Sequence, residues 1–595
     1  MATVNFPRDT TLKDGISMQE LAACGGSAPG AADLCYKRLV AKATTKEEVD
    51  ALFAEWWHVQ YDASKYSKSQ MLERWFGTVL DDDRVHGCTV PLYSTSTSAI
   101  GELTDDSVGL VAVPSTESTS GRDDFAHLPQ FWCVEVAAEK KADGSHDIYY
   151  VEHIDDLADV RSGEHLCWVL QKNTFVREWR ENGYQLLKMR CHQAPGYSRW
   201  PEGKDRQGHV YAYMAHPKYA AGKLGGKVTC GTGLAPVNYT SHTAGVTLWR
   251  TRGTQYSGGS GRLPKFLDRM TRLKYARKGN SGTIEGCTSY NYQYKAAVAE
   301  TGVKRFILTT TQAANLIVGS AVSIGTDTDG STDRNVADVH DIATEILITK
   351  IEPVTISGTE YAAVYVNAES GFNTTKDQTL ISTMPYFSGW NDNVQGTDGS
   401  RYSATTGREP ALLQKVEFQN GSYLIISDEI WQWGQNAAGD YTFDCYRCKD
   451  QSKVSGTAIT DDYEKMEGLT LTFPASAGTS WRWRYIEDTD PGEVEWPTGV
   501  NASGSGVGCK AGFLCNPAAS GLRAGWCFAN LNDGGHCGVS CRNSNNSLGN
   551  ANWNGCLGAL VHKIGELFHR VMVSSLMCEN CLKPTAAGTS GEGCW

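Results

Sequence analysis

Apolar side chains in the first part of the chain recur at the spacing of an α-helix. They lie three or four positions apart, at Val49, Leu52, Phe53, Trp56, Trp57, Met71, Leu72, Trp75 and Phe76. A stripe with this spacing covers one face of a helix and has to be buried against a core. Thr44 or Thr45 precedes the stripe and suits an N-cap. We therefore predict a helical N-terminal region, residues 1–85, with a core lined by tryptophan; an alternative is an element that docks onto a larger assembly.

Aromatic and β-branched runs replace this pattern after residue 85. The runs at 131–139, 147–154 and 165–172 are short and contain Val, Tyr and Trp, which favours strands. Residues 86–195 are accordingly expected to form a mixed α/β region. Residues 196–302 are rich in Gly, Tyr and Ser around a helical stretch from Arg262 to Tyr275.

Short strands separated by polar turns are predicted next. Apolar runs at 304–311, 316–326, 344–356 and 360–366 indicate a compact β-barrel or sandwich inserted at residues 303–385. Residues 386–595 return to a composition rich in Gly and Trp, with strands expected at 421–434 and 480–487.

Length and composition narrow the class of protein. A chain of 595 residues is too long for a single core, so about two to four domains are expected. The 62 glycines and 17 tryptophans suit β-rich domains with many turns and large aromatic anchors. A net charge of −12 argues against a nucleic-acid partner, which would need a basic surface.

The sequence also indicates in which cellular compartment the chain is made. The first residues lack the apolar stretch of a secretory signal, and no apolar run reaches the roughly 18 residues of a membrane helix. We therefore expect synthesis in a cytoplasm and no membrane insertion. Most of the 19 cysteines are expected to be buried thiols, because no secretion signal accompanies them.

Three patterns that resemble catalytic or metal sites are weak. Two C-x-x-C pairs, Cys445 with Cys448 and Cys578 with Cys581, could bind zinc, but they lie far apart, so core thiols or a disulfide are favoured. His536 and Cys537 are adjacent, and neighbouring side chains diverge rather than form a nucleophile and its base. The acidic clusters at 81–83 and 327–333 lack the spacing of a calcium loop. We predict no catalytic residue, no metal and no cofactor.

The stretch from Gly534 to Cys556 is the most unusual part of the chain. It is crowded with Asn, Gly, Ser and Cys, lacks Lys, Glu and Pro, and includes Trp553 between two asparagines. Flexible linkers share much of this composition but not a tryptophan in such a setting. Small polar residues beside a fixed aromatic suit a surface that binds through adaptable hydrogen bonds, as antibody loops do.

These residues resemble a known family. The segment 520–526 (SGLRAGW) followed by 536–555 (HCGVSCRNSNNSLGNANWNG) is similar to the variable region of proteins diversified by diversity-generating retroelements. The blocks at 266–294 and 411–434 resemble upstream blocks of gut-phage tail proteins of that family. The resemblance covers residues 195 to 595.

The resemblance implies an α+β fold with a C-type-lectin-like (formylglycine-generating-enzyme-like) domain. That domain would comprise residues 196–302 and 386–595, would be interrupted by the β-rich insertion, and would have its variable region at about 520–556. The variable side chains would lie on one exposed face and bind ligand. They are His536, Cys537, Ser540, Cys541, Arg542, Asn543 and Ser544, with Asn530, Asn532, Asp533, Gly549 and Cys556 as further candidates. The scaffold of that face would be Trp526, Gly538, Asn545, Asn546, Asn550, Asn552, Trp553 and Asn554.

The family also implies a function. Its phage members are receptor-binding proteins at tail-fibre tips, so this resemblance implies a non-enzymatic virion protein, a homotrimer, with a host-cell receptor (a protein or a glycan) and other tail proteins as partners. The retroelement rewrites adenines, so Asn codons of the form AAY become codons for Ser, Cys, Gly, His, Arg, Tyr or Asp. Two alternatives remain open: a virion structural or decoration protein, and a formylglycine-generating oxidase. About 40 residues follow the N-W-N triplet, more than in many family members. Because these residues could cover part of the variable face, the sequence does not decide whether that face is fully exposed.

Overall fold

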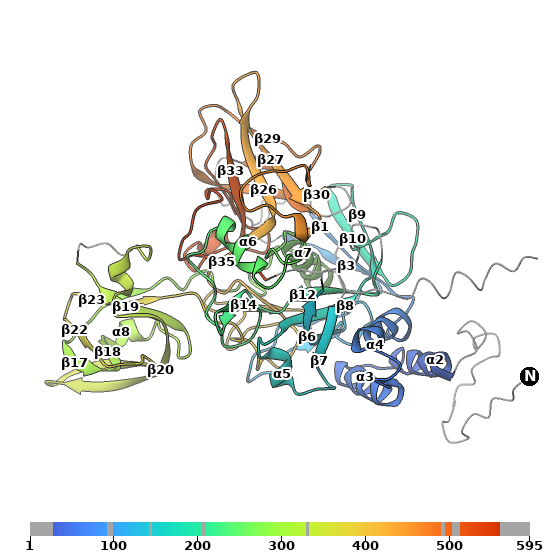
Figure 1. The fold of residues 1–595 in the computed structure, drawn as a ribbon, viewed down its shortest axis with the longest axis horizontal. Coiled ribbons are helices and arrows are strands. Elements are labelled where there is room, and N and C mark those ends of the chain that lie inside the picture. Colours follow the sequence, from blue (N-terminus) through green and yellow to red (C-terminus); the bar gives the residue numbers. More distant parts are fainter. Residues whose placement is uncertain are drawn as a thin grey trace, which may run out of the picture.

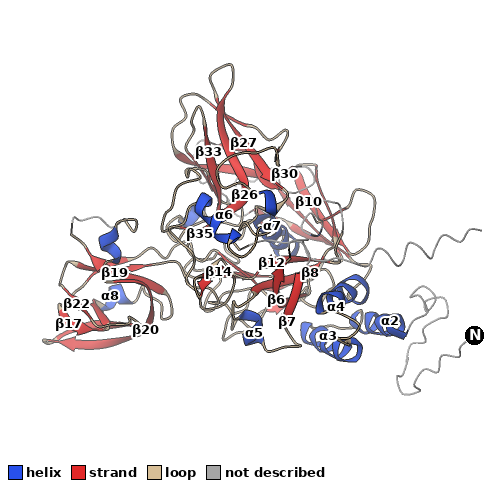
Figure 2. Cartoon of the chain, in the orientation of Figure 1, coloured by secondary structure: helices blue, strands red, loops and turns tan. Residues whose placement is uncertain are grey.

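The computed structural model describes residues 28–91, 99–141, 146–200, 203, 210–328, 333–489, 494–501 and 512–559. The protein is α+β, with many antiparallel sheets and few helices (Figures 1 and 2). In the described part of the chain, no helix combines the length and the apolar character needed to cross a membrane.

The N-terminal region is helical, as predicted. It consists of α2 (Ala28–Val40), α3 (Lys46–Gln60), α4 (Lys68–Arg74) and the π-helical turn η1 (Trp75–Val79). The predicted N-cap of α3 is Thr45, whose side chain accepts a hydrogen bond from the Glu48 backbone N–H while the Glu48 side chain returns to the cap. Residues 1–27 of this predicted region lie outside the described residues.

The tryptophan core of these helices is confirmed, but the helices do not enclose it alone. The Phe53 ring lies 5.0 Å from the ring of Trp75 and 5.3 Å from that of Trp132, between ring centroids. Trp132 directly precedes strand β6 (Cys133–Lys140), so the helices pack on the neighbouring strands and share their core. The helical region is therefore built onto the body, as Figure 1 shows.

Two antiparallel sheets lie beside the helices. Their strand orders are β11-β9-β10-β1-β3 and β12-β8-β6-β7. The strands predicted at 131–139, 147–154 and 165–172 are confirmed as β6, β7 and β8. The remaining bounds are β1 (Val85–Pro91), β3 (Glu102–Asp105), β7 (His146–Val151), β8 (Leu166–Lys172), β9 (Phe175–Glu181), β10 (Tyr184–Arg190), β11 (Ser198–Arg199) and β12 (Tyr213–Pro217).

Two further helices pack in the middle of the body. Helix α6 (His242–Arg250) is capped by Ser241, and α7 (Arg262–Tyr275) has the bounds expected from the sequence. Every residue of α7 from Arg262 to Lys274 is buried. Its basic side chains form ion pairs inside the body: Arg272 Nη1 lies 2.5 Å from Glu178 Oε1 of β9.

Short elements connect these layers. They are α5 (Leu157–Arg161), β2 (Ala99–Ile100), β4 (Ala112–Val113), β5 (Arg122–Asp123), β13 (Gly222–Leu224), β14 (Lys227–Thr229), β15 (Arg277–Lys278), β24 (Ala411–Leu413) and β25 (Val416–Phe418).

A six-stranded sheet, together with a small two-stranded one, stands apart from the body at the left of Figure 1. Its strand order is β16-β23-β19-β20-β21-β18, and it has its own hydrophobic core. The strands are β16 (Gln293–Lys295), β17 (Glu300–Val303), β18 (Arg305–Leu308), β19 (Ala321–Thr326), β20 (Ala343–Ile356), β21 (Thr359–Val366), β22 (Phe372–Thr374) and β23 (Thr379–Thr383), with helices α8 (Thr310–Ala313) and η3 (Ala337–His340). The strands expected at 304–311, 316–326, 344–356 and 360–366 are β18 to β21. We call residues 293–383 the inserted body.

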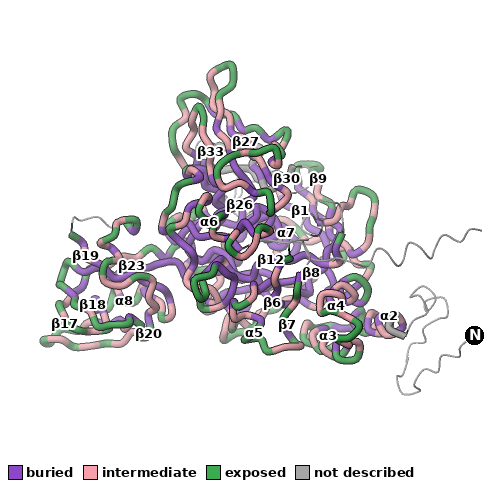
Figure 3. The backbone as a smooth tube through the Cα atoms, viewed as in Figure 1, coloured by how far each residue is buried: buried purple, intermediate pink, exposed green. Residues whose placement is uncertain are grey.

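The C-terminal part is built on a ten-stranded sheet. Its main order is β28-β27-β26-β33-β34-β32-β30-β31, with β29 beside β27 and β35 parallel to β26. The strands predicted at 421–434 and 480–487 are β26 and β30. The bounds are β26 (Tyr423–Gln435), β27 (Tyr441–Cys448), β28 (Tyr463–Lys465), β29 (Leu471–Phe473), β30 (Ser480–Thr489), β31 (Val494–Asn501), β32 (Gly512–Cys515), β33 (Gly521–Phe528), β34 (Arg542–Asn543) and β35 (Gly555–Leu557), with 3₁₀ turns η4 (Gln451–Lys453) and η6 (Gly534–His536). Figure 3 shows buried backbone through the centre of the body and exposed backbone along the hairpin ends.

The shared aromatic core gives a first prediction. Trp132→Ala removes a fully buried ring that contacts three aromatic side chains of the helices, so we expect the free energy of unfolding to fall by about 3–5 kcal/mol. Urea denaturation followed by circular dichroism measures it. Trp179→Ala on β9, whose ring is partly exposed, is the control and should change stability by less than about 1 kcal/mol. Equal losses in the two variants would contradict a shared core.

Candidate functional site

The Asn-rich segment, residues 530–556, supplies strand β34 and the start of strand β35 to the ten-stranded sheet, and consists otherwise of turns and irregular backbone. Its strand β34 pairs antiparallel with β33 and parallel with β32, and its end pairs with β26 through β35. The segment is thus held by strands from three parts of the C-terminal sequence.

The expectation that the variable side chains form an exposed face is wrong for eight of the twelve candidates. The buried ones are Asn530, Cys537, Ser540, Cys541, Arg542, Asn543, Ser544 and Cys556. The physical reason is that the segment runs against the interior of the body, where its side chains pack into hydrophobic cores. Cys537 and Cys541 belong to one hydrophobic core and Cys556 to the other.

The exposed part of the segment is therefore smaller and differently composed. Asn532 and Gly549 are exposed, and Asp533 and His536 are partly exposed. Asn545 and Asn550, which were assigned to the scaffold, are also exposed. The other scaffold residues are buried or partly so: Trp526, Gly538, Asn546 and Trp553 are buried, and Asn552 and Asn554 are intermediate.

Main-chain hydrogen bonds fix the path of the segment. Neighbouring backbone N–H groups donate to its carbonyls: Tyr423 to Asn554 at 2.7 Å, Thr243 to Leu548 at 3.1 Å and Ala524 to Asn546 at 3.0 Å. In the other direction, the Ser544 N–H donates to the Leu514 carbonyl at 2.8 Å. Bonds of this kind do not depend on the identity of the side chain.

One buried side chain outside the segment adds a specific support. Asn280, which follows α7, accepts a hydrogen bond from the Val539 N–H at 3.0 Å. Its amide donates to the Ile284 carbonyl at 2.6 Å and to Gln419 Oε1 at 2.7 Å. The sequence placed this residue within the block at 266–294 but gave no reason to single it out.

The inserted body contacts the N-W-N triplet. The backbone N–H of Trp553 donates to Asn335 Oδ1 at 3.1 Å, and the Arg334 guanidinium lies 4.9 Å from the centroid of the Trp553 ring. Tyr239 joins the two parts: its N–H donates to the Asn552 carbonyl and its hydroxyl donates to the Arg334 carbonyl at 2.7 Å. Sequence reasoning did not find this contact, because it links positions about 200 residues apart.

Two side-chain contacts fix the beginning of the segment, one made by Asp533 and one by His536. The Tyr423 hydroxyl donates to Asp533, and burial raises the pKa of Asp533 to about 6. The His536 ring stacks on Trp481 of β30, with centroids 4.4 Å apart, and burial lowers the pKa of this histidine. His536 directly follows the exposed Gly535 in sequence, and the exposed Asn532 lies four positions before it.

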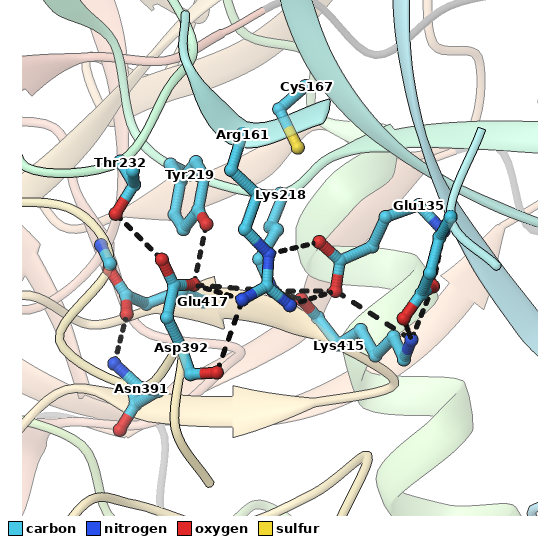
Figure 4. Close-up of polar contacts among 12 residues, drawn as sticks. Glu135, Arg161, Cys167, Lys218, Tyr219, Thr232, Asn391, Asp392, Lys415 and Glu417 are labelled. Atoms are coloured by element: carbon cyan, nitrogen blue, oxygen red, sulfur yellow. Dashed lines mark hydrogen bonds and ion pairs between the residues drawn. The ribbon is translucent and has the colours of Figure 1, made fainter. Parts of the chain in front are cut away.

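A second cluster of functional groups lies inside the body (Figure 4). Arg161 forms two hydrogen bonds with Glu135, at 2.6 and 2.7 Å, and Lys218 Nζ lies 3.1 Å from Glu135 Oε1. Lys415 pairs with Glu152, and Asp392 accepts hydrogen bonds from Tyr219 at 2.5 Å and Thr232 at 2.6 Å. We call these residues, together with Glu417, the ion network.

Charge balance explains how the network is buried. Burial by itself would raise the pKa of Glu135, but Lys218, Lys415 and Arg161 outweigh it and hold that pKa below its ordinary value. Glu417 has the opposite shift: burial, then the charge of Asp392, raises its pKa to about 8. The network thus sets three basic side chains against four acidic ones, and the raised pKa of Glu417 favours its neutral form at neutral pH.

The chemistry open to the network is limited. The cavity beside Glu417 and Tyr219 has a volume of about 20 Å³, enough for one water molecule. Burial, followed by the charge of Glu135, raises the pKa of the Cys167 thiol well above its ordinary value, so this cysteine is not an activated nucleophile. We interpret the network as structural.

The cysteine and acidic patterns of the sequence can be compared with the structure. Within the described ranges, no group of three or more His, Cys, Asp or Glu side chains is arranged to hold a metal ion. Every described cysteine except Cys35 is buried, and Cys445 and Cys448 lie on β27. Cys578 and Cys581, like all of residues 560–595, lie outside the described residues.

Comparison with known proteins adds no assignment. The chain matches no protein-family model, and no curated protein is similar to it in sequence.

The contrast between the buried Asn280 and the exposed Asn545 can be tested. Asn280→Ala leaves the Val539 N–H and the Ile284 carbonyl without their buried partner, so the free energy of unfolding should fall by about 2–4 kcal/mol. Asn545→Ala, at an exposed position of the segment, should change it by less than about 0.5 kcal/mol. Chemical denaturation of both variants measures the difference, and a destabilisation of Asn545→Ala equal to that of Asn280→Ala would disprove the contrast.

Glu417 gives a pH prediction. Between its ordinary pKa of 4.5 and its raised pKa of about 8, the folded protein binds a proton that the unfolded chain does not. Stability from this group therefore falls as pH rises through that window, by at most about 1.4 kcal/mol for each pH unit. Glu417→Gln lacks this dependence, so its stability relative to the wild type should rise between pH 5 and pH 8. Glu360→Gln, on the surface of the inserted body, is the control. A constant difference for Glu417→Gln would contradict the raised pKa.

Proposed function

We propose that this protein is a receptor-binding protein of a bacteriophage tail, whose Asn-rich segment is diversified by adenine-directed retroelement mutagenesis. The C-terminal part would have a C-type-lectin-like fold, the helical N-terminal region would attach to the virion, and the receptor would be a protein or glycan of the host surface. The protein would act without catalysis, as a homotrimer in the assembled tail.

The main-chain anchoring of the Asn-rich segment is the observation that carries the proposal. A segment that accepts many side chains has to keep its path whichever residues it holds. The hydrogen bonds from Tyr423, Thr243 and Ala524 reach its backbone carbonyls, and Asn280 holds a backbone N–H. Substitution within the segment leaves all of these bonds in place.

The burial of eight candidates restricts which side chains can take part in binding. The exposed contact surface would be formed by Asn532, Asn545, Gly549 and Asn550, with His536 stacked on Trp481 nearby. Small polar side chains give modest affinity at each site, and display on three chains and several fibres would raise it by about 10²–10⁴-fold through avidity.

A structural or decoration protein of the virion is the second candidate. The burial of Cys537, Cys541 and Ser544 favours it, because core positions contribute to folding rather than to contact with a receptor. In that case the segment would tolerate variation without using it.

The two candidates differ in how the gene varies. Sequencing the 3′ end of the gene across a growing viral population should show substitutions on AAY codons between Trp526 and Cys556. The exposed positions should accept large residues such as Tyr and Arg. The buried positions that hold Asn, Cys or Ser should keep small residues, because a larger side chain would overpack the core. Arg542 is the buried candidate that already holds a large side chain. The codons of residues 411–434 serve as the internal control. A flat profile would reject diversification and favour the structural protein.

A further inference from the structure

Three charged side chains meet at the C-terminal end of α7, apart from the ion network. Lys274 Nζ lies 2.7 Å from Asp123 Oδ2 and 2.5 Å from Asp398 Oδ2. The side chain of Lys274 is 0% exposed and that of Asp398 is 3% exposed. One positive charge therefore faces two carboxyl groups inside the body.

This imbalance favours the acid form of one carboxyl group, that of Asp398. Burial raises the pKa of Asp398, and the charge of Asp123 raises it further. The Gln414 N–H donates to Asp398 Oδ1 and the Tyr275 hydroxyl donates to Asp398 Oδ2, each at 2.9 Å. Asp398 is thus fixed beside the amine as a proton carrier.

The second carboxyl is fixed as well. The Phe125 N–H donates to Asp123 Oδ1 at 3.1 Å, and the Thr397 hydroxyl donates to Asp123 Oδ2 at 2.8 Å. These bonds draw electron density from the carboxyl carbon and hold it next to Lys274 Nζ. An amine and a carboxyl held together in this way react with effective molarities of about 10⁵–10⁸ M, which favours condensation over the separate groups.

We propose that Lys274 and Asp123 condense into an isopeptide bond, with Asp398 as the proton relay. The Lys274 ammonium passes a proton to the Asp123 carboxylate, and the neutral amine attacks the carboxyl carbon of Asp123. A new C–N bond forms and one C–O bond breaks. Asp398, in its acid form, gives its proton to the leaving hydroxyl, which departs as water, and takes up the proton that the new amide nitrogen loses. Asp398 therefore ends as it began, and no oxidant or further reactant is needed.

An open cleft of about 550 Å³ lies in this part of the body and is lined by Lys274, Tyr275 and Thr283, among others. The product would join positions 123 and 274, which are 151 residues apart in the sequence. It would tie strand β5 covalently to the buried helix α7.

Lys415 is a natural comparison, because it also lies against a carboxylate, Glu152, with a second one nearby. There the neighbouring Glu135 is surrounded by three cations that keep its pKa low, so it stays ionised and carries no proton to relay. We therefore expect one cross-link in the described chain and none at Lys415.

The intact mass of the purified full-length protein, measured under denaturing conditions, decides the proposal. The expected mass is that of the sequence less one water molecule, and proteolytic mapping should yield a branched peptide that contains Lys274 and Asp123. A full sequence mass after incubation of the folded protein at neutral pH would overturn the proposal, and this result needs no variant.

Substitutions then show which side chains form the proposed bond. Lys274→Met and Asp123→Ala should restore the full mass, whereas Asp123→Asn should lose one ammonia molecule in place of water. Asp398→Asn keeps both reacting groups but removes the relay, so most of the protein should retain its full mass. Lys415→Met, the matched control, should still lose one water molecule; loss of the cross-link in that variant while circular dichroism shows a folded protein would contradict the assignment to Lys274.

Discussion

The burial of Glu135 constrains the rest of the structure. Its carboxylate is fully buried on β6 and is stabilised only because cations arrive from three separate places: Arg161 at the end of α5, Lys218 after β12 and Lys415 in the β24–β25 turn. Removing one partner from a buried ion pair leaves an uncompensated charge, at a penalty of about 3–5 kcal/mol. The strands of the N-terminal half and the turns of the C-terminal half therefore have to be assembled together. Lys415 reaches the network from a two-residue turn in which both residues, Gln414 and Lys415, have positive φ, a conformation unfavourable for side chains other than glycine.

Under the proposed diversification, the Asn-rich segment would have to combine variation with folding. Its backbone path is fixed by hydrogen bonds from residues outside the segment. Yet eight of its twelve candidate side chains are buried, and several of them pack into the hydrophobic cores. The codons reachable from AAY are mostly for small or polar residues, and seven of the eight buried candidates hold Cys, Ser or Asn; the eighth is Arg542. Trp553 and Trp526, which an adenine change in an Asn codon does not produce, fill the larger volumes.

The sequence was informative where the signal was local. The helical spacing and the threonine cap of α3, the bounds of α7 and the strands of the inserted body all follow from short-range patterns, and the structure contains them. Burial in the Asn-rich segment was not predictable from composition, since Asn and Ser are usually exposed and are covered here only by long-range packing of the fold. The contacts that complete the site, such as Asn280 to Val539 and Arg334 to Trp553, join distant positions and carry no local pattern. The ion network was not predicted for the same reason. Its members are charged residues at distant positions, and only the fold brings them together.

The inserted body has a consequence for how this protein could evolve. The chain enters it at β16 and leaves it at β23, and these two strands are antiparallel neighbours, with Gln293 paired to Ser382. Its two ends are therefore adjacent in space, and recombination could exchange the whole unit for another with the same spacing while the ten-stranded sheet stayed intact. An exchanged unit would have to keep the loop that holds Trp553 through Arg334 and Asn335. It would also have to keep the contacts of Ser320 with Tyr290, of Asn315 with Arg408 and of Glu345 with Asn238. Lineages that share these contacts could differ in the rest of the unit.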